Sequence, residues 1–440
     1  MSTKGCWVAA RLAAAGLTAL SPVVFRAATV QGATIVALTR LAKGNDNRGA
    51  IAVDARLGRV FLANYAARSL RVLDAANGGF PRTIDLGSQP PLAVAVDEAT
   101  NRVFVTLAST GAKTPARVRV LDARDGHTVR TIDVGAFPQT VVVDEATNRA
   151  FVLTGATYLS TPSHGSVDIL DATTGLPRGT LAVNGVPIAA AVAGPAGRLF
   201  VATSTYHSDS QTWTSALDMR DASSGRLVRT LPLANAASPG GVILATDARM
   251  NRLVATYTSL IDTGYGANVR VLDAATGDVL RTLTLRSSEV MSAGTSPSAL
   301  AMDGATGHAF VTSYDATTYA GRLSILDAST GAILRTSTAG LGRFPISVAA
   351  ATGVRRLVVI DRDVNDGQAG GSGSVRILDA VSGRLLHIVS LPIGTAIPND
   401  VVTSARLAFM TDVSGVTSVL DLRSGRILHT WWESAASKSS

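Results

Sequence analysis

An aspartate followed by small residues and a glycine recurs eight times along this 440-residue chain. Each aspartate closes a short β-rich segment, such as Arg119-Val120-Leu121 before Asp122, and a second β-rich segment follows the glycine. The spacings between successive aspartates are 48, 49, 50, 52, 54, 52 and 42 residues. A period of this length is typical of one supersecondary unit stacked many times, so the sequence predicts a repeat protein. The aspartates are Asp74, Asp122, Asp171, Asp221, Asp273, Asp327, Asp379 and Asp421.

A second pattern interleaves with the first and adds two strands to each repeat. Val94–Asp97 and Val103–Val105 are short apolar, partly β-branched runs separated by turn-forming residues, which predicts a strand, a tight turn and a strand. Each unit therefore contains four strands, called a, b, c and d in chain order. The a–b pattern returns at 141–152 and 300–311 and, more loosely, at 51–62, 190–201, 243–254, 348–359 and 401–410.

Four short antiparallel strands in each period of ~40–50 residues are the signature of a β-propeller blade. The predicted fold class is therefore all-β, a propeller of eight blades by direct count, with seven blades as the alternative if one terminal unit is degenerate. Thr34–Leu41 is a further candidate strand that would pair with the last blade and close the ring, because an open ring leaves unpaired edges. The predicted domains are a signal peptide over 1–30, a single propeller over 31–435 and a disordered tail over 436–440.

The N-terminus resembles a secretory signal, with Lys4 and Arg11 ahead of the apolar run Leu12–Phe25 and small residues after it. Cleavage near Ala28 would remove three basic residues and no acidic ones, lowering the formal net charge from +8 to +5, together with Cys6, the only cysteine. That cysteine count excludes a disulfide framework and a multi-cysteine metal site. No later stretch reaches the ~18 apolar residues of a membrane-spanning helix. We therefore expect an extracytoplasmic protein, secreted or periplasmic, with no transmembrane span in the mature chain.

The two ends of the blades are expected to differ in character. In a propeller the a–b and c–d turns emerge on one face, here called the turn face, and the b–c and d–a connections emerge on the other, the loop face. The turn-face connections are short and uniform, so their aspartates are interpreted as structural residues that bond their own backbone. The loop-face connections vary, and long b–c loops are predicted at 106–117, 153–165, 202–215, 255–268, 312–322 and 360–374.

The scarce amphipathic aromatic residues gather in these b–c connections. All seven tyrosines lie in or beside them, whereas the expected core strands use Phe, Val, Leu and Ile. Such residues on one face of a rigid scaffold give large contact area at low entropy cost, and they predict a protein, peptide or glycan partner. Tyr65 and Tyr257 lie close to strand b, where a half-exposed strand end is the alternative interpretation. The predicted binding residues are Tyr158, His164, Tyr206, His207, Trp213, Tyr265, Tyr314 and Tyr319.

Three motifs recur in the repeats. Phe61-Leu62-Ala63-Asn64 is followed by Ser69–Asp74, the linker Val134-Gly135-Ala136-Phe137-Pro138 precedes a strand, and prolines stand before strand a at Pro91, Pro187, Pro239, Pro297, Pro345 and Pro398. Over roughly residues 45–433 the chain resembles the YVTN-repeat β-propeller family. The resemblance implies the propeller fold. Because this broad class includes lactonases and heavy subunits of quinoprotein dehydrogenases, it also implies an enzyme as the alternative function. The family's b-strand Asn is present at Asn64 and replaced at Leu107, Thr154, Thr203, Thr256 and Ser313.

Catalytic and metal-binding motifs are few. The six histidines are scattered and only four glutamates are present, so the leading interpretation is a non-catalytic protein without a cofactor. One acidic segment, with Asp361, Asp363, Asn365 and Asp366 ahead of Gly367, alternates oxygen ligands as a calcium-binding loop does. Its glycine falls at position seven instead of about position six and no glutamate follows at about position twelve, so a solvated loop is favoured and calcium is the alternative.

Two series of arginines repeat with the blades. One closes the a–b turns and the other opens or flanks strand d, which predicts basic residues on the turn face and on the outer wall. Such a basic stripe predicts binding of single-stranded nucleic acid or an acidic glycan as a third candidate function, although 28 aspartates in neighbouring turns neutralise much of its field. The first series is Arg59, Arg102, Arg149, Arg198, Arg252 and Arg406, and the second is Arg82, Arg130, Arg178, Arg229, Arg281 and Arg335.

Overall fold

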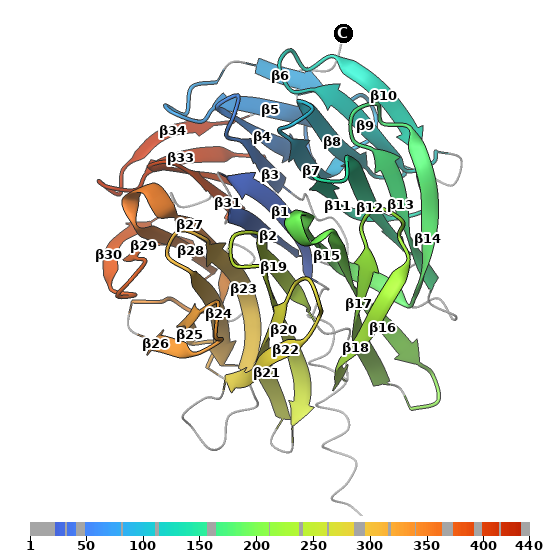
Figure 1. Cartoon of the computed structure of the whole chain (residues 1–440). Coiled ribbons are helices and arrows are strands. Elements are labelled where there is room, and N and C mark those ends of the chain that lie inside the picture. Colours follow the sequence, from blue (N-terminus) through green and yellow to red (C-terminus); the bar gives the residue numbers. More distant parts are fainter. Residues whose placement is uncertain are drawn as a thin grey trace, which may run out of the picture.

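The computed structural model is a ring of eight four-stranded antiparallel sheets, each built from one repeat (Figure 1). The innermost strand of every sheet is strand a, and the sheets follow one another in chain order around the ring. The prediction of an eight-bladed propeller is confirmed, and the seven-blade alternative is wrong. The described residues are 23–30, 33–40, 49–80, 82–110, 114–155, 164–210, 212–236, 241–261, 264–285, 295–315, 318–338, 340–362, 373–390, 398–412 and 415–432.

The first four blades each run through strands a, b, c and d in chain order. Blade 1 contains β3 (Gly49–Asp54), β4 (Arg59–Asn64), β5 (Ser69–Asp74) and β6 (Arg82–Asp85). Blade 2 contains β7 (Pro91–Asp97), β8 (Arg102–Leu107), β9 (Arg117–Asp122) and β10 (Thr128–Asp133). Blade 3 contains β11 (Pro138–Asp144), β12 (Arg149–Gly155), β13 (His164–Asp171) and β14 (Pro177–Asn184). Blade 4 contains β15 (Val186–Ala193), β16 (Arg198–His207), β17 (Thr212–Asp221) and β18 (Leu227–Ala236).

The last four blades repeat the same order. Blade 5 contains β19 (Ile243–Asp247), β20 (Arg252–Ile261), β21 (Gly264–Asp273) and β22 (Val279–Leu285). Blade 6 contains β23 (Thr295–Asp303), β24 (His308–Asp315), β25 (Gly321–Asp327) and β26 (Ile333–Ser337). Blade 7 contains β27 (Pro345–Ala351), β28 (Arg356–Arg362), β29 (Gly373–Asp379) and β30 (Leu385–Ser390). Blade 8 contains β31 (Pro398–Ser404), β32 (Leu407–Asp412), β33 (Thr417–Asp421) and β34 (Ile427–Trp431).

The helical content of the described residues is two short 3₁₀ turns, η2 (Gly194–Ala196) and η3 (Thr352–Val354), which stand in the a–b turns of blades 4 and 7. Within the described part of the chain, no helix has the length and apolar character needed to cross a membrane.

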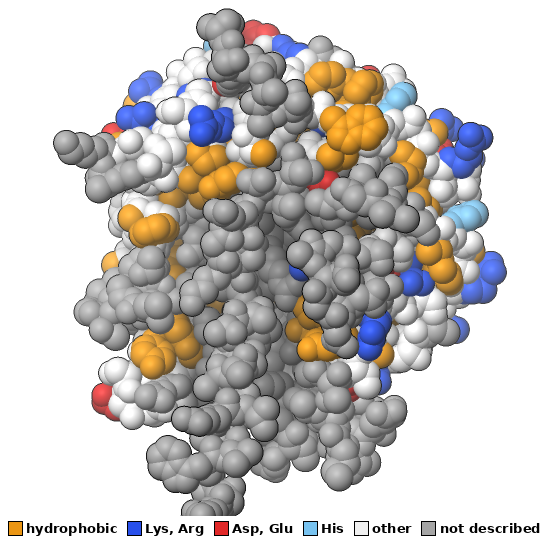
Figure 2. Space-filling model, turned by 180° about the vertical axis from the view of Figure 1, so that it is seen from behind, with side chains coloured by type: hydrophobic (Ala, Val, Ile, Leu, Met, Phe, Trp, Pro, Cys, Tyr) orange, Lys and Arg blue, Asp and Glu red, His pale blue; other side chains and the backbone are white. Residues whose placement is uncertain are grey.

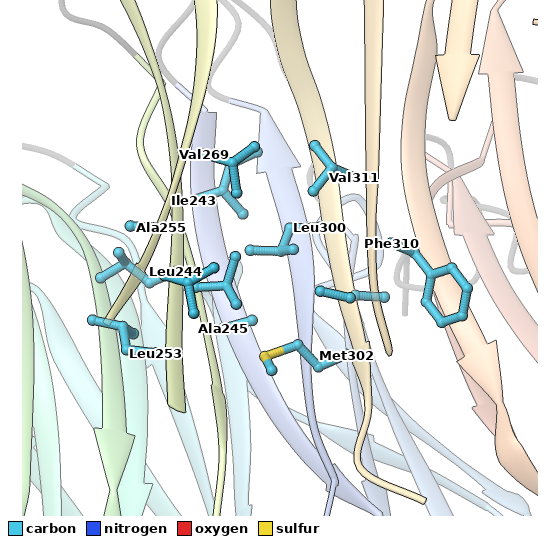
Figure 3. Packing of buried hydrophobic residues seen from close by; sticks show 14 of the residues in the cluster. Ile243, Leu244, Ala245, Leu253, Ala255, Val269, Leu300, Met302, Phe310 and Val311 are labelled. Atoms are coloured by element: carbon cyan, nitrogen blue, oxygen red, sulfur yellow. The ribbon is translucent and has the colours of Figure 1, made fainter. Parts of the chain in front are cut away.

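Apolar layers between neighbouring blades form the core. Strand a is apolar on both sides, as at Val141 and Val142, because adjacent blades cover both faces of each sheet. Figure 3 shows the layer in which side chains of β19 and β20 lie beside those of β23 and β24. In six blades the third residue of strand b is a fully buried phenylalanine, which fills the space between sheets: Phe61, Phe104, Phe151, Phe200, Phe310 and Phe409.

Each c–d turn is built around its aspartate. In blade 4, Asp221 accepts hydrogen bonds from the Ser223 and Ser224 hydroxyls, both at 2.7 Å, and its backbone N–H donates to the Arg226 carbonyl at 2.9 Å. Gly225 has a φ of 73°, and a Cβ there would lie 2.4 Å from Leu181 of the preceding blade, so this position needs glycine. The same backbone pattern occurs in all eight blades, and the repeated aspartates are structural.

The arginines that close the a–b turns tie one blade to the next. Four of them also pair with the strand-c aspartate of their own blade, at 2.8 to 3.5 Å. Because these guanidiniums are occupied, the arginine series is a set of structural contacts more than a free basic stripe, which argues against phosphate-driven binding of nucleic acid. Three of these arginines donate a hydrogen bond to a c–d turn carbonyl of the following blade: Arg102 to Thr173 (2.9 Å), Arg198 to Ala275 (3.1 Å) and Arg252 to Ser329 (3.2 Å).

The ring closes without exchanging a strand. Blade 1 and blade 8 each take all four strands from one end of the propeller sequence. The candidate closing strand Thr34–Leu41 does not join blade 8: β2 (Ala33–Arg40) pairs with β1 (Val23–Val30) in a separate hairpin, so that prediction is wrong. Segments this close in sequence pair at a low cost in loop entropy. The hairpin lies at the centre of the ring against the innermost strands of all eight blades (Figure 1). Strand β1 falls within the predicted signal peptide, which stays a prediction.

A buried arginine joins blade 1 to blade 8. Arg71 of β5, only 2% exposed, donates to the Thr417 hydroxyl at 2.8 Å and to the Trp431 carbonyl at 3.3 Å, and its guanidinium lies 5.2 Å from the centre of the Phe80 ring. The closing junction therefore uses a strand-c position that also joins other blades, with additional contacts. In three other blades the arginine at that position donates a hydrogen bond to a backbone carbonyl of the preceding blade: Arg119 to Asp85 (3.2 Å), Arg270 to Pro232 (2.8 Å) and Arg376 to Gly340 (3.1 Å).

Candidate binding surface on the loop face

Two b–c hairpins extend farther on the loop face than their counterparts. Strands β16 and β17 pair as far as His207 and Thr212, and β20 and β21 pair as far as Ile261 and Gly264. The segments 202–215 and 255–268, predicted as loops, are therefore largely strand, and those two predictions are wrong. Their Thr, Tyr, Trp and Ile residues suit a pleated strand, and this preference outweighs the polar character that suggested loops.

The blade 4 hairpin carries an aromatic pair. Tyr206 and Trp213 are directly opposite each other on β16 and β17, with ring centres 5.0 Å apart and ring planes inclined at 44°. Trp213 is buried and Tyr206 is half-buried, while the exposed His207 ring hydrogen-bonds the Thr214 hydroxyl at 2.8 Å. Three of the predicted binding residues thus lie together on one hairpin.

A second aromatic group, here called the blade 6–7 aromatic cluster, consists of Tyr314, Tyr319 and Phe344. The Tyr314 and Phe344 rings have centres 4.3 Å apart, and the Tyr319 ring lies 6.1 Å from Phe344 and 6.4 Å from Tyr314. Tyr314 and Phe344 are buried, whereas Tyr319 is 37% exposed. The cluster therefore presents one tyrosine ring on a packed aromatic base.

The backbone holds this cluster in a strained conformation. The Phe344 N–H donates to the Tyr319 carbonyl, and the Tyr319 N–H donates to the Asp315 carbonyl, both at 2.8 Å. The first bond joins the b–c connection of blade 6 to the linker that enters blade 7, and the second lies within that b–c connection. Tyr319 and Phe344 have φ of 59° and 48°, a left-handed conformation that costs bulky residues on the order of 1–3 kcal/mol. Strain maintained by its surroundings is found preferentially at ligand-binding positions.

Phe344 is not among the predicted binding residues, because the sequence pattern assigns phenylalanine to core strands. Its counterpart in the linker to blade 3, Phe137, also precedes the proline of strand a, also has a positive φ of 52°, and is 55% exposed. A Phe-Pro dipeptide at the start of strand a, at Phe137-Pro138 and at Phe344-Pro345, is the sequence signal that would have identified both. The third such dipeptide, Phe80-Pro81, lies between strands c and d of blade 1.

The remaining predicted residues divide into two groups. Tyr158 lies outside the described residues, and for His164 and Tyr265 the strands are described but not the side chains. Tyr257 is 3% exposed within β20, with the Arg270 guanidinium 5.4 Å from its ring centre, so it is a buried strand residue and the interpretation as a half-exposed strand end is wrong for it. The predicted binding residues whose aromatic side chains are described therefore form two groups, one on blade 4 and one between blades 6 and 7.

The first residue of the calcium candidate belongs to a structural network. Asp361 is 3% exposed and accepts hydrogen bonds from the Ser374 hydroxyl at 2.7 Å, from the Gly342 N–H at 3.1 Å and from the Arg376 guanidinium. A carboxylate with these donors has little acceptor capacity left for a cation. The other three candidate ligands lie outside the described residues, and calcium stays a prediction: Asp363, Asn365 and Asp366.

Carboxylates on the turn face of blades 1 to 3 have raised pKa values. Glu98 of blade 2 accepts a hydrogen bond from the Ala55 N–H of blade 1, and Glu145 of blade 3 accepts one from the Glu98 N–H, both at 2.9 Å. Burial, with the nearby charges of Asp54 and Glu145, raises the pKa of Glu98 to about 7. Such a value suits a general acid or base. Both glutamates, however, bond the backbone of the preceding blade, which assigns them a capping role.

Six c–d aspartates, those of blades 3 to 8, have lowered pKa values. Burial alone would raise the pKa of Asp171, but hydrogen bonds from Arg178 and Thr174 outweigh it and lower the pKa to about 2. The hydroxyls of Ser223 and Ser224 hold the pKa of Asp221 well below its usual range. These ionised turn aspartates contribute stability above their ordinary pKa of 3.8, and that stability is lost as the pH falls through the lowered value.

The surface shows separate patches. Seen from behind, hydrophobic side chains form several distinct groups with basic side chains mainly toward the edge (Figure 2). In the described part of the chain, no three His, Cys, Asp or Glu side chains converge as the ligands of a metal ion would.

The fold and this surface define the class as an eight-bladed β-propeller with aromatic groups on its loop face. No family model and no curated protein sequence matches the chain. Among solved structures it is similar to the computationally designed Ika8 protein, with a TM-score of 0.54 and 14% identity over 90% of this chain and 98% of that one. It is also similar to BamB from Moraxella catarrhalis, with a TM-score of 0.49 and 13% identity over 90% and 95% of the two chains. A third match is quinohemoprotein alcohol dehydrogenase from Comamonas testosteroni, with a TM-score of 0.49 and 11% identity over 76% and 65%. At these identities the likeness concerns the fold.

Proposed function

We propose that this chain is an exported, non-catalytic β-propeller of the YVTN-repeat type that binds a protein, peptide or glycan partner through its loop face. The blade 6–7 aromatic cluster carries the proposal. It places an exposed Tyr319 on two buried rings, and backbone hydrogen bonds hold Tyr319 and Phe344 in a left-handed conformation. A pre-positioned aromatic ring loses little entropy on binding, which is why tyrosine dominates recognition surfaces.

The blade 4 pair supplies a second contact on the same face. Tyr206 and His207 lie on an extended hairpin whose backbone is fixed by continuous pairing with β17. Two rigid aromatic groups separated on one face suit an extended partner that crosses several blades better than a small ligand in a single pocket.

The enzyme alternative has less support among the described residues. A lactonase-like site would need carboxylates and amides that converge at one end of the channel. The described glutamates with raised pKa values instead accept hydrogen bonds from the neighbouring backbone.

Quantitative co-purification from the native cell envelope tests the proposal. We expect one set of partners with the wild-type chain, and at least tenfold depletion of that set with Tyr319→Asn combined with Tyr206→Ala. Asparagine tolerates the left-handed backbone at position 319, so this change removes the ring without adding strain. Val381→Ser, in a c–d turn of the other face, is the matched control and should retain the partners. Identical partner sets for all three chains would refute binding through the loop face.

A further inference from the structure

A groove on the outer wall between blades 6 and 7 is lined by two arginines that have no partner among the described residues. It has a volume of about 480 Å³ and lies between β26 and the c–d turn of blade 7. Arg335 lines it from β26 and Arg384 from the turn, and both residues are exposed. Neither guanidinium makes a hydrogen bond or an ion pair with any described residue.

Two other blade junctions show how the equivalent positions are filled there. Between blades 4 and 5, Arg229 stands in the place of Arg335 and Asp278 in the place of Arg384, and the two form an ion pair at 2.9 Å. Between blades 2 and 3 the equivalent Arg130 donates to a turn carbonyl of the next blade at 3.0 Å. At the blade 6–7 groove the two positions both hold cations, and such like charges repel unless an anion lies between them.

We propose that this groove binds the phosphate or sulfate group of a small organic monoester. Guanidinium groups present paired N–H donors that match the oxygens of these anions. Thr336, which also lines the groove, has a hydroxyl that can donate a further hydrogen bond. The volume is within the ~300–1,000 Å³ range of sites for small organic ligands, and Leu385 gives the wall an apolar portion. These two features favour an ester with an organic group over the free ion. The site lies on the outer wall and is separate from the proposed loop-face interaction.

Calorimetric titration of the full chain at low salt tests the proposal, with phenyl phosphate, phenyl sulfate and inorganic phosphate as separate probes. We expect saturable binding at one site per chain and tighter binding of the two esters than of inorganic phosphate. No saturable binding up to about 20 mM of either ester would overturn the proposal. Equal affinity for inorganic phosphate and the two esters would overturn the proposal that the groove prefers an ester with an organic group.

Substitutions at equivalent positions assign the site. Arg384→Asp reproduces the Arg–Asp pair of blades 4 and 5, so it should fold normally and weaken binding at least tenfold. Arg384→Ala should weaken it in the same direction, which covers the case that the aspartate variant folds poorly. Arg281→Gln is the matched control, because Arg281 holds the same strand-d position opposite Ala332 instead of a second arginine. Equal weakening by Arg281→Gln would mean that net charge, and not this groove, attracts the anion.

The reciprocal change provides an independent measure. Asp278→Arg in blade 5 places two arginines opposite each other at the blade 4–5 junction, and we expect the stoichiometry to rise from one ester per chain to two. An unchanged stoichiometry would contradict the inference that the opposed arginines create the site.

Discussion

The blade 4–5 and blade 6–7 junctions use equivalent positions of the repeat with different chemistry. At the first junction Arg229 pairs with Asp278, and Arg198 donates to the Ala275 carbonyl of the same c–d turn. At the second, the place of Arg198 is taken by His308 and the place of Asp278 by Arg384, and the Arg335 guanidinium bonds no described residue. Tyr319 and Phe344, whose backbones are strained, belong to the same two blades: Tyr319 lies in the b–c connection of blade 6 and Phe344 in the linker that enters blade 7.

This difference contrasts a junction whose described side chains bond each other with a junction at which we propose binding. The repeated backbone supplies the same positions at every junction, and several junctions fill them with contacts that hold the ring together. A junction without those contacts is less stabilised, but its cations and aromatic rings can contact other molecules. Such a loss of stability is expected at a binding site.

The largest effect is expected at the closing junction. Arg71→Ala removes donors to the Thr417 hydroxyl and the Trp431 carbonyl, and it should lower the free energy of unfolding by about 3 kcal/mol, because hydrogen bonds to charged groups each contribute ~1.5–3 kcal/mol. Arg119→Ala, at the same position with a single described acceptor, should cost about 1.5 kcal/mol. Urea denaturation measures both. Equal losses would show that closing the ring requires no special contact.

The next largest effect on the free energy of unfolding is expected in the c–d turns of blades 5 and 7, which belong to the two compared junctions. Asp273→Ala disturbs a turn that bonds arginines of blade 4, so we expect a loss of about 2 kcal/mol, against about 1 kcal/mol for Asp379→Ala in blade 7. Thermal unfolding followed by circular dichroism gives the two values. A greater loss for Asp379→Ala would mean that the blade 6–7 junction is bonded more strongly than its described contacts indicate.

Glu98→Gln should change the dependence of stability on pH at the junctions of blades 1 to 3. The pKa of Glu98 is raised from 4.5 to about 7, so the stabilisation of the folded state by its protonated form is complete below pH 4.5 and is lost as the pH rises through about 7. We expect the wild-type melting temperature to fall more than that of the variant between pH 5 and 8. Parallel curves for the two chains would contradict the raised pKa.

The smallest effect is expected for the ion pair itself. Arg229→Gln removes a partner of Asp278 in a pair whose side chains are 44% and 65% exposed, and exposed pairs contribute little because water and salt screen them. The urea midpoint should move by an amount close to experimental error, and less still at high salt. A clear loss of stability would mean that the opposed arginines of the blade 6–7 groove forgo substantial stabilisation.

The regular part of the molecule could be predicted from local patterns. Asp221, Gly225 and their equivalents determine turns through bonds within a few residues, so spacing and residue type were sufficient to count strands and blades. The hairpins of blades 4 and 5 were less predictable, since Thr- and Tyr-rich segments suit both loop and strand. Phe344 was missed for a different reason: its role depends on Tyr314 and Tyr319, which reach it only when blades 6 and 7 pack together.

The amino-acid sequence by itself determined the repeat, the four strands of each blade and the turn face, because all of these depend on hydrogen bonds between near neighbours in the chain. Tertiary structure alone decided which side chains meet across blade junctions. Arg71 with Thr417, Arg229 with Asp278, and Arg335 opposite Arg384 come from different blades, and their charges have consequences only at the distances that ring closure and blade packing impose. The blade 6–7 aromatic cluster and the blade 6–7 groove belong to this second category.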